Sequence, residues 1–501
     1  MPAIGRAVHV VIAAAALGIV GQLLFFDVAI GLNFPIAVAL LVACGWLLRR
    51  PMAGVEWRDL WLGPAAVAFA SFAAIRADTS IVVLDSLTAL GLAGAALASY
   101  GRRAVLRRSF GELITLGISV AGWVGAGAVP ALGATRRRMP AARGAVGRAR
   151  PALPVLRGLV IALPVMLVFI SLFSAADAVF ARVVDDLTGF DLDLGTVPGR
   201  VILAMVLGWL AAGSLALAAS RPAIRSERTP SADRAAWRLG RTEAVTVLVA
   251  VDLLFAAFVA LQGAYLFGGA DTLGAIGMTY SEYARRGFFE LVAVAILAGG
   301  LIVAAERLAR DRSRALLAAA IGLAALTAVV LISAALRLRL YQEAYGWTEL
   351  RLYVLATIML LAGILVALIL ALLTDRVRWI GHAVLALGLV VGIGLSILGP
   401  ARFITEQNVA RALDPSLVPA QGQSGMDTIY ALSLGDDRIP DLVRVLPALD
   451  DDEAAFVREE LRFRLHELRT DPALDAWQAW NLGRARALSA LETADARGEL
   501  D

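Results

Sequence analysis

The chain contains no lysine, so all 46 of its basic residues are arginine. Because lysine is missing from polar and apolar stretches alike, its absence points to the codon usage of a GC-rich genome rather than to chemistry. The single cysteine, Cys44, excludes a disulfide framework and a cysteine-based metal cluster. The three histidines, His9, His382 and His466, are too scattered to form a metal site from neighbouring ligands. We therefore expect no metal and no cofactor.

Charge is also scarce. Only 18% of the residues are charged, 59% are apolar, and the mean hydropathy is +0.75. A soluble chain of 501 residues would fold as several domains, but this composition is typical of a polytopic membrane protein. Strand patterning is absent. We therefore expect an all-α fold, namely a polytopic transmembrane helix bundle with a small helical C-terminal soluble domain.

The two ends of the chain carry opposite charge. From Arg402 onward there are 11 arginines and 19 acidic residues, a net charge of −8, so the overall +4 leaves +12 for the preceding part. These arginines flank apolar stretches, which is an orientation signal and not a nucleic-acid footprint. We expect an inner-membrane protein with a cytoplasmic N-terminus and an extracytoplasmic C-terminal domain.

Stretches with the roughly 20 apolar residues needed to cross a bilayer predict eleven crossings. The first could be a cleaved signal peptide, but further spans follow at once, and we favour a retained helix. In the second, Asn33-Phe34-Pro35 predicts a kink. The predicted crossings are Ala7–Phe26, Val28–Leu48, Leu60–Ile75, Ser80–Tyr100, Val155–Ala175, Pro198–Ala219, Thr242–Phe267, Gly287–Ala305, Arg314–Leu336, Arg351–Thr374 and Val377–Leu398.

One further apolar stretch, Phe110–Val129, has basic residues on both sides. If it crossed, six arginines without an acidic residue would lie outside, against the positive-inside rule. We therefore predict a re-entrant or interfacial segment. The expected organisation is N-terminal hairpins at 1–110, this segment with a basic cytoplasmic linker at 111–154, the main bundle at 155–400 and the tail domain at 401–501. In the tail, Val457, Leu461, Leu465 and Leu468 predict one buried helical face.

Two polar motifs interrupt the apolar stretches: the first polar motif, Tyr280–Glu290 (YSEYARRGFFE), and the second polar motif, Tyr345–Tyr353 (YGWTELRLY). In a helix, residues four apart share a face, as Glu282, Arg286 and Glu290 would. The candidate ligand-binding residues are Tyr280, Glu282, Arg285, Arg286, Glu290, Tyr345, Glu349, Arg351 and Tyr353.

Each motif has a structural and a functional interpretation. Glu282, Arg286 and Glu290 can form an ion-pair ladder, and Thr348 with Glu349 can be a helix N-cap followed by an acidic first turn. Alternatively, the arginines bind an anionic lipid headgroup or a lipid-linked phosphate. Two intramembrane carboxylates, Asp252 and Asp85, are either proton- or cation-responsive groups or structural hydrogen-bond acceptors.

Several segments resemble a bacterial membrane family known as domain of unknown function 4153/4173. The resemblance rests on GLNFPIAVALL, SAADAVFARVV, EYARRGFFELVAVA and AYGWTELRLYV, and in the tail on Asn408, Asp427–Tyr430, Gly435–Pro440 and Trp480-Asn481. It covers nearly the whole chain and implies a polytopic inner-membrane protein with an extracytoplasmic tail. It implies no reaction.

Three functions remain open. The first is a transporter or permease whose path passes Asp252 and the polar motifs, with discontinuous spans in support. The second is an envelope sensor or assembly factor that binds a protein partner through 401–501. The third is a membrane enzyme acting on a lipid-linked anionic substrate, with Glu282 or Glu290 as base. No catalytic triad or metal set is present in the sequence, so we lean away from an enzyme.

Overall fold

The computed structural model describes residues 7–49, 57–101, 105–106, 108, 110–131, 196–220, 240–267, 288–309, 313–419 and 426–500. The predicted all-α class is confirmed, because the regular elements in these ranges are α-helices and short 3-10 helices. Within them, eight helices are long and apolar enough to cross a membrane. These are α1 (Ala7–Phe25), α4 (Thr79–Tyr100), α9 (Val197–Ala219), α10 (Arg241–Phe267), α13 (Phe288–Leu308), α14 (Arg314–Tyr345), α15 (Glu349–Leu373) and α16 (Ile380–Leu398).

The described residues pack as two units, and the first contains α1 to α3, most of α4, α5 (Phe110–Ala126), α9 and residues 469–481. One close crossing is between α1 and α9, where Gly18 lies against the Ala204 carbonyl and Gly208 lies close to the backbone of Ala14. Small residues at such a crossing let two helix backbones approach closely. α1 is therefore an integral part of this unit.

The second apolar stretch forms a shorter helix than predicted. α2 (Asn33–Leu48) begins at the Asn-Phe-Pro motif, where a kink within a longer span was expected. The buried Asn33 side chain accepts a hydrogen bond from the Gly31 N–H and donates to the carbonyls of Leu24 and Ala29. It thereby fixes the turn before α2. Pro35 falls in the first helical turn, where a missing N–H costs nothing.

Two other expected spans also differ. Residues 60–75 form α3 (Leu62–Ser71) followed by a 3-10 turn, η2 (Phe72–Ala74), instead of one long helix. α5 has 17 residues and a length of about 25 Å, short of the roughly 30 Å of bilayer hydrocarbon. Its predicted re-entrant or interfacial placement stays a prediction. Val155–Ala175 lies outside the described residues, so the total of eleven crossings also stays a prediction.

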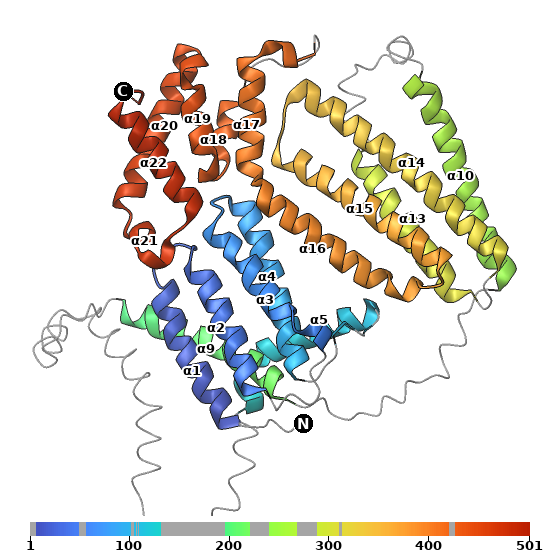
Figure 1. Ribbon diagram of the computed structural model, residues 1–501, viewed down its shortest axis with the longest axis horizontal. Coiled ribbons are helices and arrows are strands. Elements are labelled where there is room, and N and C mark those ends of the chain that lie inside the picture. Colours follow the sequence, from blue (N-terminus) through green and yellow to red (C-terminus); the bar gives the residue numbers. More distant parts are fainter. Residues whose placement is uncertain are drawn as a thin grey trace, which may run out of the picture. The chain divides into compact units, whose positions relative to one another are not determined.

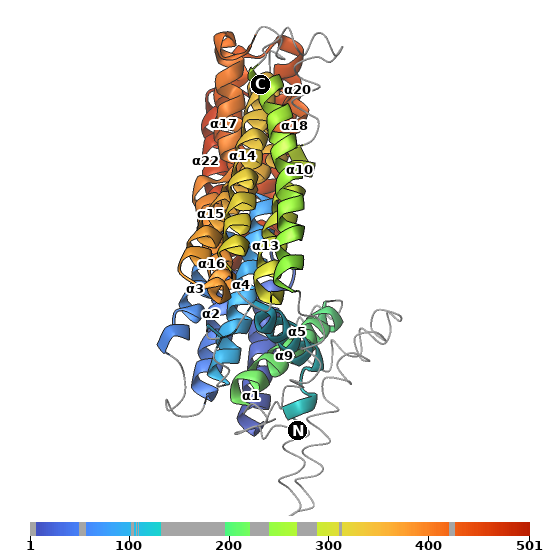
Figure 2. The ribbon, with the colours of Figure 1, turned by 90° about the vertical axis from the view of Figure 1, so that its right-hand side faces the viewer.

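In the second unit, α10, α13 and α15 pack against the long helix α14, and α16 packs against α15. Figure 1 shows α13 to α16 side by side, and Figure 2 shows α10 running along α14. The shared core contains Leu323, Leu338, Ile358 and Leu368. α14 was predicted to end at Leu336 but continues to Tyr345, giving a helix about 48 Å long. Its polar last turns therefore extend beyond the hydrocarbon.

The end of α16 is a sharp joint to α17 (Pro400–Leu413), a helix the sequence did not reveal. Gly399 takes the left-handed conformation (φ +69°), and Pro400 opens α17. Arg76 donates hydrogen bonds to the carbonyls of Ser396 and Ile397 at the end of α16. Asp78 accepts from the Ala401 N–H in the first turn of α17 (3.2 Å). One short segment thus binds both sides of the joint.

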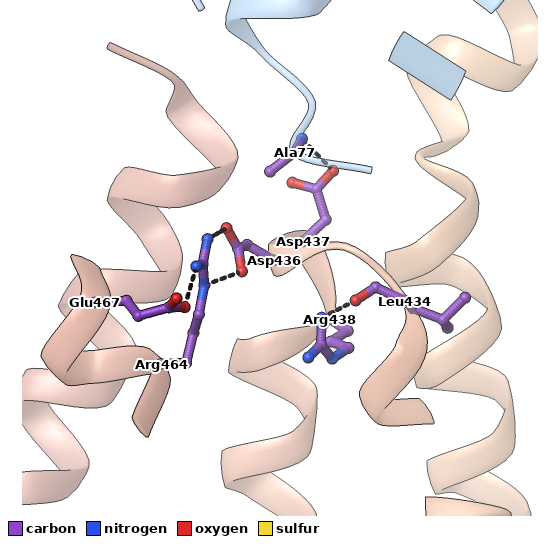
Figure 3. Close-up of polar contacts among 7 residues, drawn as sticks. All are labelled: Ala77, Leu434, Asp436, Asp437, Arg438, Arg464 and Glu467. Atoms are coloured by element: carbon purple, nitrogen blue, oxygen red, sulfur yellow. Dashed lines mark hydrogen bonds and ion pairs between the residues drawn. The ribbon is translucent and has the colours of Figure 1, made fainter. Parts of the chain in front are cut away.

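The C-terminal helices of this unit are α18 (Thr428–Ser433), α19 (Ile439–Val445), α20 (Asp451–Thr470, through Leu468) and α22 (Leu482–Ala496). The predicted face of α20 is confirmed, since Val457, Leu461, Leu465 and Leu468 are buried. Residues 477–479 form a 3-10 turn, and α22 begins after it at Leu482. Figure 3 shows Arg464 of α20 binding Asp436 through two hydrogen bonds (2.8 and 2.7 Å).

Candidate functional site

The second polar motif forms the turn between α14 and α15. Gly346 follows the last residue of α14 with φ +75°, a conformation that L-residues rarely adopt. Thr348 then caps α15, its hydroxyl accepting from the Arg351 N–H. The N-cap interpretation of Thr348 is therefore confirmed, and Glu349 occupies the acidic first turn of α15.

Two arginines hold the carbonyl end of α14. Arg351 donates through Nη1 to the carbonyls of Tyr345 and Gly346, and its guanidinium carbon lies 4.1 Å from the centroid of the Tyr341 ring. Arg411 of α17 donates to the carbonyls of Glu343 and Ala344. Burial, and next the like charge of Arg351, lowers the pKa of Arg411. Both cations therefore converge on the negative end of the helix dipole.

Polar side chains of α17 and α18 bind the same turn. The Asn408 side chain accepts from the Trp347 N–H (2.8 Å) and donates to the Trp347 carbonyl (2.9 Å), so both of its amide groups are used. The Tyr430 hydroxyl accepts from the Glu349 N–H (2.7 Å). Burial raises the pKa of Tyr430. These bonds connect a membrane helix pair with C-terminal helices of the same unit.

A cavity of about 370 Å³ opens beside this turn. Its lining includes Gly346, Thr348, Arg351, Asn408, Arg411 and Tyr430. We call it the turn cavity. It combines two guanidinium groups, a phenol and backbone groups with the carboxylates of Asp427 and Glu453. The guanidinium groups are the part of this lining that suits an anionic ligand.

Some of the predicted ligand-binding residues lie at the turn cavity. Tyr345 and Arg351 line it, Glu349 contributes its N–H to the Tyr430 bond, and Tyr353 packs against a neighbouring core cluster. Tyr280, Glu282, Arg285 and Arg286 lie outside the described residues, as does the side chain of Glu290 in the first turn of α13. Their predicted role in binding stays a prediction.

The two predicted intramembrane carboxylates, Asp85 and Asp252, have different surroundings. Asp85 of α4 is 1% exposed. Asp252 of α10 faces Gly322 of α14, where an added Cβ would lie 3.4 Å from Oδ2. Its Oδ1 is buried and has no hydrogen-bond partner among the described residues. No group of three or more metal-ligating side chains occurs in the part of the chain that was described.

Sequence reasoning missed three contributors to the turn cavity. Asn408 and Tyr430 belong to the tail segments that carry the family resemblance, so a signal existed, but nothing in their spacing placed them beside residues 345–351. No sequence pattern around Arg411 marked it as a candidate site residue. Only the packing of α17 against the end of α14 brings it to the site.

The helices and their apolar surfaces define the class of this protein: a multi-pass integral membrane protein. Residues 63–445 match the family model described as Domain of unknown function (DUF4153), and the chain belongs to this family. The matched range includes the second polar motif, Asn408, Arg411 and Tyr430. No curated protein and no solved structure matches the chain.

Proposed function

We propose that this protein is a membrane sensor that binds a small anionic ligand in the turn cavity. The observation that carries the proposal is that the bonds bordering the cavity are the same bonds that tie α14 and α15 to α17 and α18. A ligand bound there contacts both groups of helices. Its binding energy can therefore shift the equilibrium between two arrangements of them.

The cavity chemistry selects the ligand class. Within the described residues, Arg351 uses only Nη1 for hydrogen bonds, which leaves Nε and Nη2 as donors for a ligand. Guanidinium groups bind phosphate and carboxylate through paired hydrogen bonds. A volume of about 370 Å³ suits a small molecule or a headgroup. An anionic lipid headgroup or a lipid-linked phosphate, expected from the sequence, fits this description.

Orientation follows from the charge distribution. The arginine-rich loops favour a cytoplasmic N-terminus, so the turn cavity and the acidic C-terminal helices would face the extracytoplasmic side of a bacterial inner membrane. Residues 401–501 would then be accessible to an envelope protein partner. Labelling of a cysteine introduced at position 480 with a membrane-impermeant thiol reagent tests this orientation, and protection in intact cells would reverse it.

The binding test uses the full-length protein in nanodiscs and a panel of phosphate esters, dicarboxylates and anionic lipids. A true ligand raises the melting temperature and slows hydrogen exchange at residues 345–351 and 427–430 together. Arg351→Gln should abolish both effects. Arg339→Gln is the matched control, because Arg339 is an exposed arginine of α14 that pairs with Glu343 and does not line the cavity. If a panel member binds equally to the Arg351→Gln protein, the site assignment is wrong.

A second candidate function, cation- or proton-coupled transport, is favoured by Asp252. A carboxylate with a buried, unbonded oxygen in mid-span is costly unless it serves a function. Proteoliposomes with an internal pH dye would show proton flux in the wild-type protein and none in Asp252→Asn. Equal flux in both proteins would exclude this role.

A further inference from the structure

A second cavity, of about 520 Å³, lies among α17, α19, α22 and the segment before α4. Its lining includes Arg76, Arg402, Asp437, Arg486, Ser489 and Thr493, and it shares no residue with the turn cavity. We call it the arginine cavity. All of its lining belongs to the second unit.

One wall of the arginine cavity is a single face of α22. Arg486, Ser489 and Thr493 recur every three or four residues, so they align along the helix, and Arg497 follows its last residue. Arg402 of α17 stands on another wall. The cavity is thus framed by guanidinium groups with hydroxyl groups between them.

The carboxylates of the cavity already have partners. Asp441 accepts from Arg444 (2.8 Å), and Glu499 lies 3.6 Å from Arg497. Asp437 accepts from the Ala77 N–H (3.0 Å), as Figure 3 shows. Burial raises the pKa of Asp437.

The arginines are less fully used. Arg402 and Arg486 are exposed, and neither donates a hydrogen bond to any residue that the structure describes. Arg76 donates hydrogen bonds to carbonyl groups at the end of α16. Asp441 also interacts with the charge of Arg402, and Asp437 with that of Arg76. The lining as a whole holds four arginines and three carboxylates. The cavity therefore has an excess of positive charge and two guanidinium groups with available donors.

The position of the arginine cavity indicates where its ligand comes from. Arg76 precedes α4 by three residues, and Arg402 follows the end of α16 by four, and both helices are long and apolar enough to cross a membrane. The cavity therefore lies where helices leave the hydrocarbon, at the level of lipid headgroups.

We infer that the arginine cavity binds the phosphate of an anionic ligand, through Arg402 and Arg486. Planar guanidinium groups pair with phosphate oxygens, and the Ser489 and Thr493 hydroxyls are further polar groups on the same face. The phosphate belongs either to a phospholipid headgroup or to a soluble phosphate ester.

The test compares the full-length wild-type protein with Arg402→Gln/Arg486→Gln. Arg462→Gln is the control, since Arg462 is an exposed arginine on α20 outside both cavities. Native mass spectrometry after extraction from phosphatidylglycerol nanodiscs measures retained lipid. Calorimetry with glycerol 3-phosphate measures binding of a soluble phosphate ester. Melting temperatures confirm that each variant is folded.

Retained phosphatidylglycerol that the double variant loses, while the control keeps it, supports a lipid headgroup. Saturable glycerol 3-phosphate binding without retained lipid supports a soluble ester. In either case the double variant should bind at least roughly tenfold more weakly, the effect of losing one charge-assisted hydrogen bond. Binding of neither probe, or equal binding by the double variant and the wild-type protein, overturns the inference.

Discussion

Replacing either partner of the Asp436–Arg464 pair should destabilise the C-terminal helices, and Asp436→Asn should cost more than Arg464→Met. The pair is bidentate, with Arg464 also donating to Glu467 (2.6 Å), and the exposed fractions of the side chains are 9% for Asp436 and 24% for Arg464 (Figure 3). Because both side chains are mostly buried, most of the solvent is excluded from the pair. The order of the two effects follows from the charges around the pair.

The negative charge of Asp436 offsets the positive charge of more than one arginine. Burial lowers the pKa values of Arg438 and Arg484. The negative charge of Asp436 opposes this shift, and the like charge of Arg464 adds to it. Removal of Arg464 therefore leaves Asp436 with two other cations nearby. Removal of Asp436 leaves three arginines close together without their shared anion.

Breaking a buried ion pair typically costs about 3–5 kcal/mol, and we expect Asp436→Asn to fall in this range. Arg464→Met should cost less, about 1–3 kcal/mol, because the remaining cations partly compensate Asp436 and Arg464 is partly exposed. The melting temperature of the full-length protein in detergent gives the order directly. Arg462→Met serves as the exposed control. A larger loss for Arg464→Met than for Asp436→Asn would refute the proposed sharing of Asp436.

Three further substitutions test contacts of residues that line the two cavities. Asn408→Ala removes the acceptor of the Trp347 N–H and should cost about 1–3 kcal/mol, with faster hydrogen exchange at residues 346–349; unchanged exchange would contradict this. Gly346→Ala should lower the melting temperature, because φ is +75° and a Cβ would lie 2.6 Å from Asn408 Oδ1, whereas Gly388→Ala, which meets open space, should not. Burial raises the pKa of Asp437, so the folded state binds more protons than the unfolded state above the ordinary carboxyl pKa, and stability falls as pH rises through that window. Asp437→Asn, which keeps an acceptor, should flatten this pH dependence; an unchanged profile would contradict it.

The sequence was sufficient for the features that depend on local pattern. Apolar stretches located most of the long helices within a few residues, and the spacing of Val457, Leu461, Leu465 and Leu468 identified the buried face of α20. The N-cap at Thr348 was also predictable, because capping depends on residues within one turn. In each case the determining interactions lie within a few residues of one another.

Features set by distant contacts were not predictable. The start of α2 at Asn33 depends on a side chain that binds the carbonyls of Leu24 and Ala29, outside the helix itself. α17 was missed because its mixed composition shows no strong apolar face, and Arg76 and Asp78, more than 300 residues away in sequence, fix its start. Nothing in the local pattern near residue 400 reveals such partners.

The same reasoning explains why the sequence pointed to Arg351 but not to the arginines of the second cavity. Arg351 stands in a compact polar motif between apolar helices, where any charge is conspicuous. Arg402 and Arg486 lie in polar helices, where an arginine is ordinary, and only the folded chain brings them to one cavity. What distinguishes them is that both line a cavity and neither donates a hydrogen bond to another described residue. For a membrane protein of this kind, cavity-lining arginines with available donors at the ends of spanning helices are thus a more selective indicator of an anion site than arginine content, and the arginine cavity rests on that criterion.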